Sequence, residues 1–113
     1  MTGAEKRLHE IMDVNNRLME NAPDESKAFF QFMDKAKSGP VLTDREKELI
    51  NVALSIATQC EWCITLHVKY ALEAGATKEE IIKSGFQAVL MSGGPALMHM
   101  VPVYEAIDEF GKD

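Results

Sequence analysis

Cys60, Cys63 and His67 are the residues of this chain whose types and spacing could carry out chemistry together. They lie in the stretch CEWCITLH, which contains both cysteines of the chain. On a helix, at about 100° per residue, the three side chains fall within about 60° of one another, and Cys63 and His67 are one turn apart. An imidazole in that position can accept the proton of the nearer thiol, and the thiolate is the reactive form of cysteine.

Three uses of the cysteine pair are open at this stage. A disulfide between Cys60 and Cys63 would close a very short loop and stabilise the fold little, so it is useful mainly because it can be made and broken. Two cysteines can also be small, buried apolar residues. Two thiolates, an imidazole and a carboxylate could instead bind zinc. Zinc knuckles usually carry their cysteines on a tight turn with glycine, whereas CEWC leads straight into a helix, which favours the redox interpretation.

Glu48 is the acidic residue that could act on His67. It belongs to the helical pattern that precedes the cysteines, twelve positions before Cys60. If the chain bends near residues 59–61, the two helices fold back on each other and Glu48 approaches His67. A carboxylate on the far ring nitrogen would orient the imidazole and stabilise its charged form. The alternative is a solvated carboxylate near the start of a helix, where negative charge is favourable.

The elements that must position these residues are all helical. Apolar residues follow helical spacing from end to end, and no segment of strand length alternates between apolar and polar residues. The pattern predicts an all-α fold of about six helices: one before Pro23, then 24–38, 44–59, 63–75, 78–91 and 96–110. The third of these is apolar on almost every side from residue 49 to residue 57, which is typical of a central helix.

The ends of the expected helices carry recognisable signals. Thr43 with Glu46, and Thr77 with Glu80, form the capping-box pattern that opens a helix, and Asp24 is a candidate cap for the second helix. Gly75 is suited to the residue after a helix C-terminus, and Pro102 should kink or split the last helix. Phe29, Phe30, Phe32 and the methionines are expected in the core; the wide arc of the three phenylalanines also favours a subunit interface.

Length and charge limit the classes of function. We expect one domain over residues 1–113. The formal net charge is −6 with no basic cluster, which argues against nucleic acid and anionic membranes as partners. Neither a signal-peptide pattern nor a membrane-spanning run of apolar residues is present, so a cytoplasmic location is expected.

The residues of the site resemble a known signature. Glu48, eleven residues, Cys60, two residues, Cys63, three residues and His67 is similar to the active-site pattern of the AhpD-like branch of the carboxymuconolactone decarboxylase superfamily, which includes alkylhydroperoxidase and disulfide-reductase proteins. The stretch YALEAGATKEEI and the tail MSGGPALMHMVPVYEAIDEF also resemble this superfamily, so the similarity covers roughly residues 25–110.

The resemblance implies a fold, a reaction and partners. It implies a helical bundle that assembles into trimers or hexamers and works without a cofactor or metal. Cys60 and Cys63 would cycle between dithiol and disulfide, with His67 as general base and Glu48 as the carboxylate that orients it in a proton relay. The substrate would be a small peroxide or disulfide, and a thioredoxin-like protein or a lipoyl dithiol would return the electrons.

The chain departs from the family in length and at one position of the signature. The alkyl hydroperoxide reductase D proteins carry two helical repeats in one chain, whereas this chain has space for a single unit plus an N-terminal extension of about residues 1–22. Trp62 stands where the best-known alkyl hydroperoxide reductase D proteins have a histidine, so a second relay histidine is absent. Two alternatives to the redox enzyme are a decarboxylase-like lyase acting on a small cyclic acid, with Arg45 and Lys69 as candidate carboxylate-binding residues, and a zinc-stabilised module without catalytic activity. The lactone decarboxylases generally lack the cysteine pair, which counts against the lyase.

Overall fold

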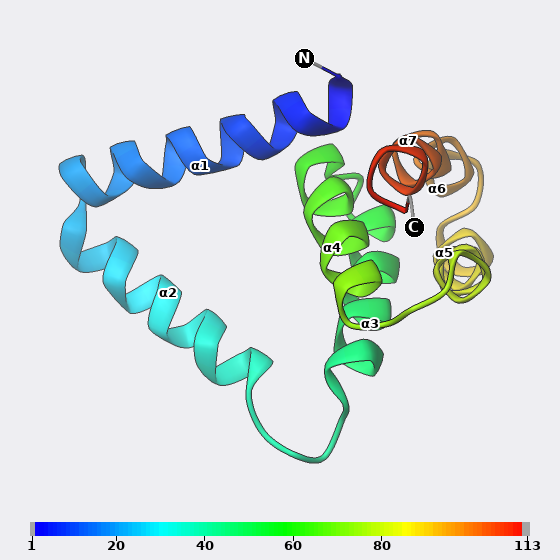
Figure 1. Cartoon of the computed structure of the whole chain (residues 1–113), viewed down its shortest axis with the longest axis horizontal. Helices are drawn as coiled ribbons and strands as arrows, with labels where there is room; N and C mark the ends of the chain where they lie inside the picture. The colour runs from blue at the N-terminus through cyan, green and yellow to red at the C-terminus, as the bar shows by residue number, and fades with distance from the viewer. Residues whose placement is uncertain (1, 112–113) are drawn as a thin grey trace.

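The computed structural model describes residues 2–111, and the regular secondary structure within that range is helical throughout, so the all-α prediction is confirmed. The helices are α1 (Gly3–Asn21), α2 (Pro23–Lys37), α3 (Asp44–Ala57), α4 (Glu61–Glu73), α5 (Lys78–Ser92), α6 (Gly94–Met98) and α7 (Met100–Phe110). Helices α3 to α7 form a bundle, and α1 and α2 extend from one side of it (Figure 1). Within residues 2–111, no helix combines the length and the apolar character needed to cross a bilayer.

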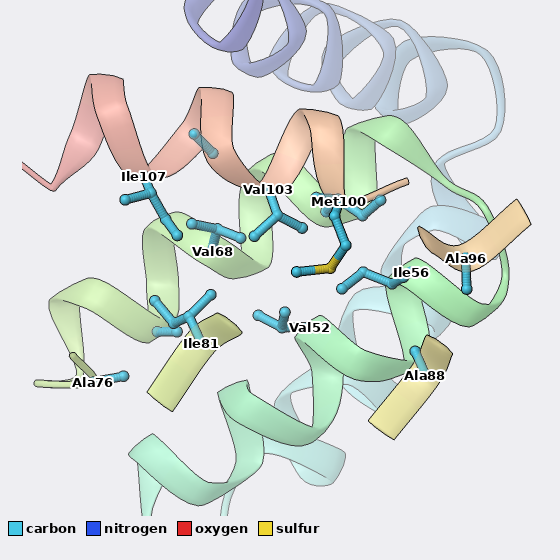
Figure 2. Close-up of a cluster of buried hydrophobic side chains, with 13 residues drawn as sticks. Val52, Ile56, Val68, Ala76, Ile81, Ala88, Ala96, Met100, Val103 and Ile107 are labelled. Carbon is cyan, nitrogen blue, oxygen red and sulfur yellow. The ribbon is translucent and has the colours of Figure 1, made fainter. Parts of the chain in front are cut away.

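The hydrophobic core lies between α3, α4, α5 and α7 (Figure 2). Its largest fully buried apolar side chains are Val52, Ile56, Ile64, Val68, Ile81 and Val103. Helix α3 packs against both α4 and α5, but Ile50 and Leu54 on its outer side are 46% and 58% exposed, so its apolar surface is only partly buried in the single chain. The two capping boxes, Thr43 with Glu46 and Thr77 with Glu80, are both formed and fix the starts of α3 and α5.

Helices α1 and α2, which we call the N-terminal arm, leave much of their apolar surface exposed. The first turn of α1 is attached to α7: Ala4 is fully buried, and its backbone N–H donates to Glu109 at 3.3 Å. Helix α2 packs mainly on α1 and touches the bundle near its C-terminal end, where Lys37 contacts Lys47 and Tyr70. Phe29 and Phe32 are 58% and 66% exposed, so the prediction that they belong to the core is wrong. Helical spacing aligns apolar residues on a face, but it does not reveal what covers that face.

Exposed apolar residues are also found among the methionines. Met12, Met19, Met91 and Met98 are exposed, whereas Met100 is buried among α3 and α5 side chains. The expectation that the methionines are core residues is therefore wrong for most of those named here. A subunit interface at these faces, and assembly into trimers or hexamers, stay predictions.

Several helix ends differ from the sequence-based prediction by one or two residues, and two differences at prolines have a clear physical reason. The expected helix over 96–110 is divided into α6 and α7 at His99. Pro102 lies in the first turn of α7; it lacks an N–H and its ring would clash with the carbonyl of Met98, so one helix cannot run through this segment. The predicted split is thus confirmed, three residues before the proline. Asp24 is not the cap of α2: the helix begins at Pro23, and Ala22 occupies the cap position without a side-chain bond.

The chain reverses direction between α3 and α4 through a Schellman motif. The Cys60 N–H donates to the Ser55 carbonyl and the Gln59 N–H to the Ile56 carbonyl, each at 3.1 Å. Gln59 has a φ of +59°, the left-handed conformation that this motif requires. The bend predicted near residues 59–61 is present, and it turns α4 back along α3.

Replacing Gln59 with glycine is expected to raise the free energy of unfolding by about 0.5–1 kcal/mol, because glycine adopts the left-handed conformation without a Cβ penalty. Gly75 provides the matched control, since it follows α4 with a φ of +92° and no atom lies within 4 Å of the position of an added Cβ. Gly75→Gln should lower stability by about 1 kcal/mol. Thermal unfolding of both variants measures this; a Gln59→Gly variant less stable than the parent would contradict it.

Candidate functional site

Cys60 and Cys63 lie at the N-terminus of α4 and are joined by a disulfide bond. Cys60 is the N-cap residue in extended conformation, and its Sγ accepts a hydrogen bond from the Cys63 N–H at 3.1 Å. Cys60 therefore precedes the helix on which the sequence analysis placed it, whereas Cys63 is in the first turn. The N-terminus of a helix carries partial positive charge, which favours a thiolate there once the bond is reduced.

His67, one turn after Cys63, is paired with Glu48. The His67 Nδ1 lies 2.8 Å from Glu48 Oε1, across the interface of α4 and α3. Because a carboxylate can only accept, Nδ1 carries the ring proton, and Nε2 is left with the lone pair in the neutral imidazole. Asn51, one turn along α3, also donates to Glu48 Oε1, at 3.3 Å. The expected approach of Glu48 to His67 is thus present in the structure.

The Glu48 carboxylate is ionised although it is only 8% exposed. Burial by itself would raise its pKa, but hydrogen bonds from His67 and Asn51 and the charges of His67 and Lys37 outweigh burial and hold the pKa below the ordinary value of 4.5. At neutral pH the group is therefore a fixed negative charge beside the imidazole.

The lowered pKa of Glu48 predicts a loss of stability in acid. A carboxyl group whose pKa is lower in the folded than in the unfolded state stabilises the fold above its unfolded pKa, and this contribution disappears as the pH falls through the folded pKa. We expect the free energy of unfolding to fall more steeply below pH 4.5 in the parent than in Glu48→Gln, by on the order of 1 kcal/mol.

Denaturant titrations of both proteins between pH 6 and pH 3 would measure the difference. The pKa values of Glu46 and Glu80 are lowered too, first by backbone hydrogen bonds in the capping boxes, but these groups are present in both proteins. The difference between the two curves therefore isolates Glu48, and parallel curves would contradict the prediction.

A pocket of about 400 Å³ opens beside Cys63 and His67, between α2 and α4. Its surface is mostly apolar, with side chains from both helices of the N-terminal arm. The residues that surround Cys63 and His67 there include Ile11, Phe29, Phe32, Met33, Trp62 and Leu66. A group that enters this pocket would contact Cys63 and His67 in apolar surroundings.

A second pocket of about 380 Å³ lies beside Glu48; charged side chains line it, although its surface is mixed in polarity. Glu48 lines it together with Asp44, Lys47 and Glu73. Of this hydrogen-bonded pair, His67 lines the apolar pocket and Glu48 lines the second one.

Three residues of this site were missed by the sequence analysis. Asn51 follows Glu48 by one helical turn, and that spacing could have identified it. Lys37, from α2, lines both pockets and its Nζ lies 4.5 Å from the centre of the Tyr70 ring, whose edge contacts His67. No sequence signal connects Lys37 with Tyr70, because their contact depends on how α2 lies against the bundle.

The other candidates of the sequence analysis lie apart from the redox pair. Arg45 forms an ion pair with Glu80, and Lys69 one with Glu73, and neither lines the pocket at Cys63. Residues 2–111 contain no group of three or more His, Cys, Asp or Glu side chains arranged to hold a metal ion.

The model of the carboxymuconolactone decarboxylase family matches residues 23–106, which include the whole site. Protein 4 of the cox locus of Paracoccus denitrificans is 43% identical over 68 residues, 60% of this chain and 61% of that protein, so the alignment spans about three-fifths of its length. An uncharacterized protein of Cupriavidus necator is 33% identical over 87% of each chain.

Solved structures agree with this similarity. Apo-lpg0406, a carboxymuconolactone decarboxylase family protein from Legionella pneumophila, superimposes with a TM-score of 0.91 at 31% identity, over 96% of this chain and 97% of that one. A protein from Methanobacterium thermoautotrophicum gives a TM-score of 0.65 at 35% identity, over 79% and 97%. The chain belongs to the carboxymuconolactone decarboxylase family.

Proposed function

We propose that the protein is a thiol–disulfide oxidoreductase of the alkylhydroperoxidase or disulfide-reductase kind, with Cys60 and Cys63 as its redox pair. One observation carries the proposal: a disulfide-bonded Cys-x-x-Cys at a helix N-terminus opens on the same pocket as an imidazole that a buried carboxylate orients. An oriented base is needed beside a cysteine that reacts, whereas cysteines that serve only as packing residues do not require one.

The reduced enzyme would act first through Cys63, which lines the apolar pocket together with His67. His67 Nε2 accepts the thiol proton, and Glu48 stabilises the resulting imidazolium. The thiolate attacks one oxygen of a hydroperoxide and the O–O bond breaks. The alkoxide leaves with the proton of the imidazolium, and Cys63 becomes a sulfenic acid.

Cys60 would complete the turnover. Its sulfur attacks the Cys63 sulfenic acid, the S–O bond breaks, and the oxygen leaves as water while the disulfide forms. One hydroperoxide and one dithiol thus give one alcohol, one water and one disulfide, a transfer of two electrons. With a disulfide substrate, Cys63 forms a mixed disulfide and releases one thiol, and Cys60 then releases the second.

A dithiol donor such as a thioredoxin-like protein or a protein-bound lipoyl group would return the disulfide to the dithiol. This requirement supports a reducing, cytoplasmic site of action as part of the proposal. A homo-oligomer, trimeric or hexameric, is also part of it, because apolar side chains of the N-terminal arm and of α5 to α7 are exposed on a single chain.

Thiol counting tests the proposal. Fully reduced protein treated with one equivalent of a small hydroperoxide should lose two thiols per chain, and a dithiol should restore both. Oxidised glutathione and oxidised lipoamide serve as parallel oxidants, so that the test covers both a peroxide and disulfides as the substrate. Two free thiols that persist with all three oxidants would remove the redox assignment.

A further inference from the structure

The two residues between the cysteines are both bound by α1. The Trp62 Nε1–H donates to Glu10 Oε1 at 3.0 Å, and Glu61 forms an ion pair with Arg7 at 3.5 Å. Arg7 and Glu10 are one turn apart on α1, so their side chains reach the same stretch of chain. The turn that carries the disulfide is thus held from outside α4, by a helix more than fifty positions earlier in the chain.

Helix α1 is anchored independently of this turn. Arg7 also pairs with Glu105 of α7 and donates to the buried Thr65 hydroxyl at 3.4 Å. Ala4 is fully buried and its N–H donates to Glu109 of α7. In the disulfide form that the structure shows, the first half of α1 is thus held on the bundle by contacts with α7 and Thr65 that do not involve the turn. The family match begins only after this helix, at residue 23.

We propose that Glu10 is a positioning residue for the redox pair: its hydrogen bond to Trp62, supported by the Arg7–Glu61 pair, stabilises the disulfide-bonded form of the turn over the dithiol form. The inference rests on the proposed function, since it concerns the equilibrium of the same two cysteines. It assigns a role in that equilibrium to a helix that precedes the matched domain.

The physical reason is a difference between the two redox states. Breaking the S–S bond replaces a covalent contact by a non-bonded one, and in this proposal the four-residue turn relaxes and Glu61 and Trp62 move with it. Helix α1 cannot follow, because α7 holds it. The contacts seen in the disulfide form are therefore weaker in the dithiol form, and a contact shifts an equilibrium by the difference of its strength in the two states.

The same linkage acts in the reverse direction. If the α1 contacts favour the disulfide, disulfide formation strengthens the attachment of α1 by the same factor. Ile11 of α1, and Phe29 and Phe32 of the following helix, line the apolar pocket beside Cys63. The redox state would thus be coupled to the helices that enclose the substrate pocket.

The test is the equilibrium with glutathione, in which the dithiol protein and one oxidised glutathione give the disulfide protein and two reduced glutathiones. The disulfide fraction is measured by acid quenching and alkylation across a series of glutathione ratios. In Glu10→Ala and Trp62→Phe we expect the equilibrium constant for disulfide formation to fall about 3- to 10-fold. Tenfold corresponds to a potential about 30 mV less negative for a two-electron couple.

Three comparisons separate this role from others. Glu10→Gln keeps an acceptor for the indole N–H and should restore the parent equilibrium to within about twofold. Glu20→Ala, which removes an exposed carboxylate near the other end of α1, should leave it unchanged and controls for net charge. In the double variant Glu10→Ala/Trp62→Phe the shift should equal that of one single variant, because both remove the same bond.

Thermal unfolding of each variant in both redox states decides between positioning and simple structural support. Glu10 and Trp62 are exposed, so the variants are expected to fold. Equal destabilisation of the disulfide and dithiol forms, with an unchanged glutathione equilibrium, overturns the inference and leaves the proposed function standing. A parent protein that shows no reversible couple with glutathione overturns both.

Discussion

Replacement of Cys63 by serine is expected to reduce peroxide or disulfide turnover by at least about 10³-fold, because a serine hydroxyl attacks peroxide oxygen or disulfide sulfur far more slowly than a thiolate does and the disulfide can no longer form. Cys60→Ser is the matched variant, with the same atom exchanged three residues away. It should lose turnover as well, but its Cys63 still attacks. With a disulfide substrate it should therefore accumulate one mixed disulfide per chain, visible by mass spectrometry.

The two variants also identify the attacking sulfur. Cys63 lines the apolar pocket with His67, whereas Cys60 caps α4. If the mixed disulfide forms rapidly in Cys63→Ser and not in Cys60→Ser, the order of attack is the reverse of the one proposed. If both variants turn over at the parental rate, the cysteines are not the redox pair.

His67→Ala is expected to slow the first thiol oxidation at pH 7 by about 10²- to 10³-fold, the range typical of a lost general base. Glu48→Gln keeps the shape of the carboxylate but can present its amide to Nδ1 and favour the wrong tautomer, so a loss of about tenfold or more is expected. The rate of loss of the first thiol under single-turnover conditions measures both effects.

The proposed proton relay predicts two further results for these variants. The double variant should be no slower than His67→Ala, because Glu48 acts through the imidazole. Raising the pH should narrow the gap between His67→Ala and the parent, since solvent then removes the thiol proton without help. His9→Ala, an exposed histidine on α1, is the control. A His67→Ala deficit that stays constant from pH 6 to pH 10 would argue for a packing role.

The parts of the site that were predictable are those encoded by local spacing. The capping boxes at Thr43 and Thr77 locate the starts of α3 and α5, and the i, i+4 spacing of Cys63 and His67 puts both on one face of α4. The approach of Glu48 needed one additional assumption, a reversal near residue 59. Gln59 adopts the left-handed conformation at this reversal. Glutamine seldom does so, and the residue type therefore does not indicate it.

The parts that were not predictable depend on contacts between distant segments. Phe29 and Phe32 have the spacing of core residues, yet α2 lies away from the core and its side chains line a pocket. No feature of the sequence connects Glu10 with Trp62. Only the crossing of α1 over the start of α4 brings these two residues together. The spacing of apolar residues shows which face of a helix is apolar. It does not show where that helix lies relative to the bundle.

Glu48 and His67 form one hydrogen-bonded pair but line different pockets, which has a consequence for the proposed reaction. If the protein is the proposed oxidoreductase, protons could pass to bulk water through the pocket lined by Asp44 and Glu73 while the organic molecule occupied the apolar pocket. A bulky substrate that fills its own entrance would therefore not obstruct the path by which hydrogen ions come and go.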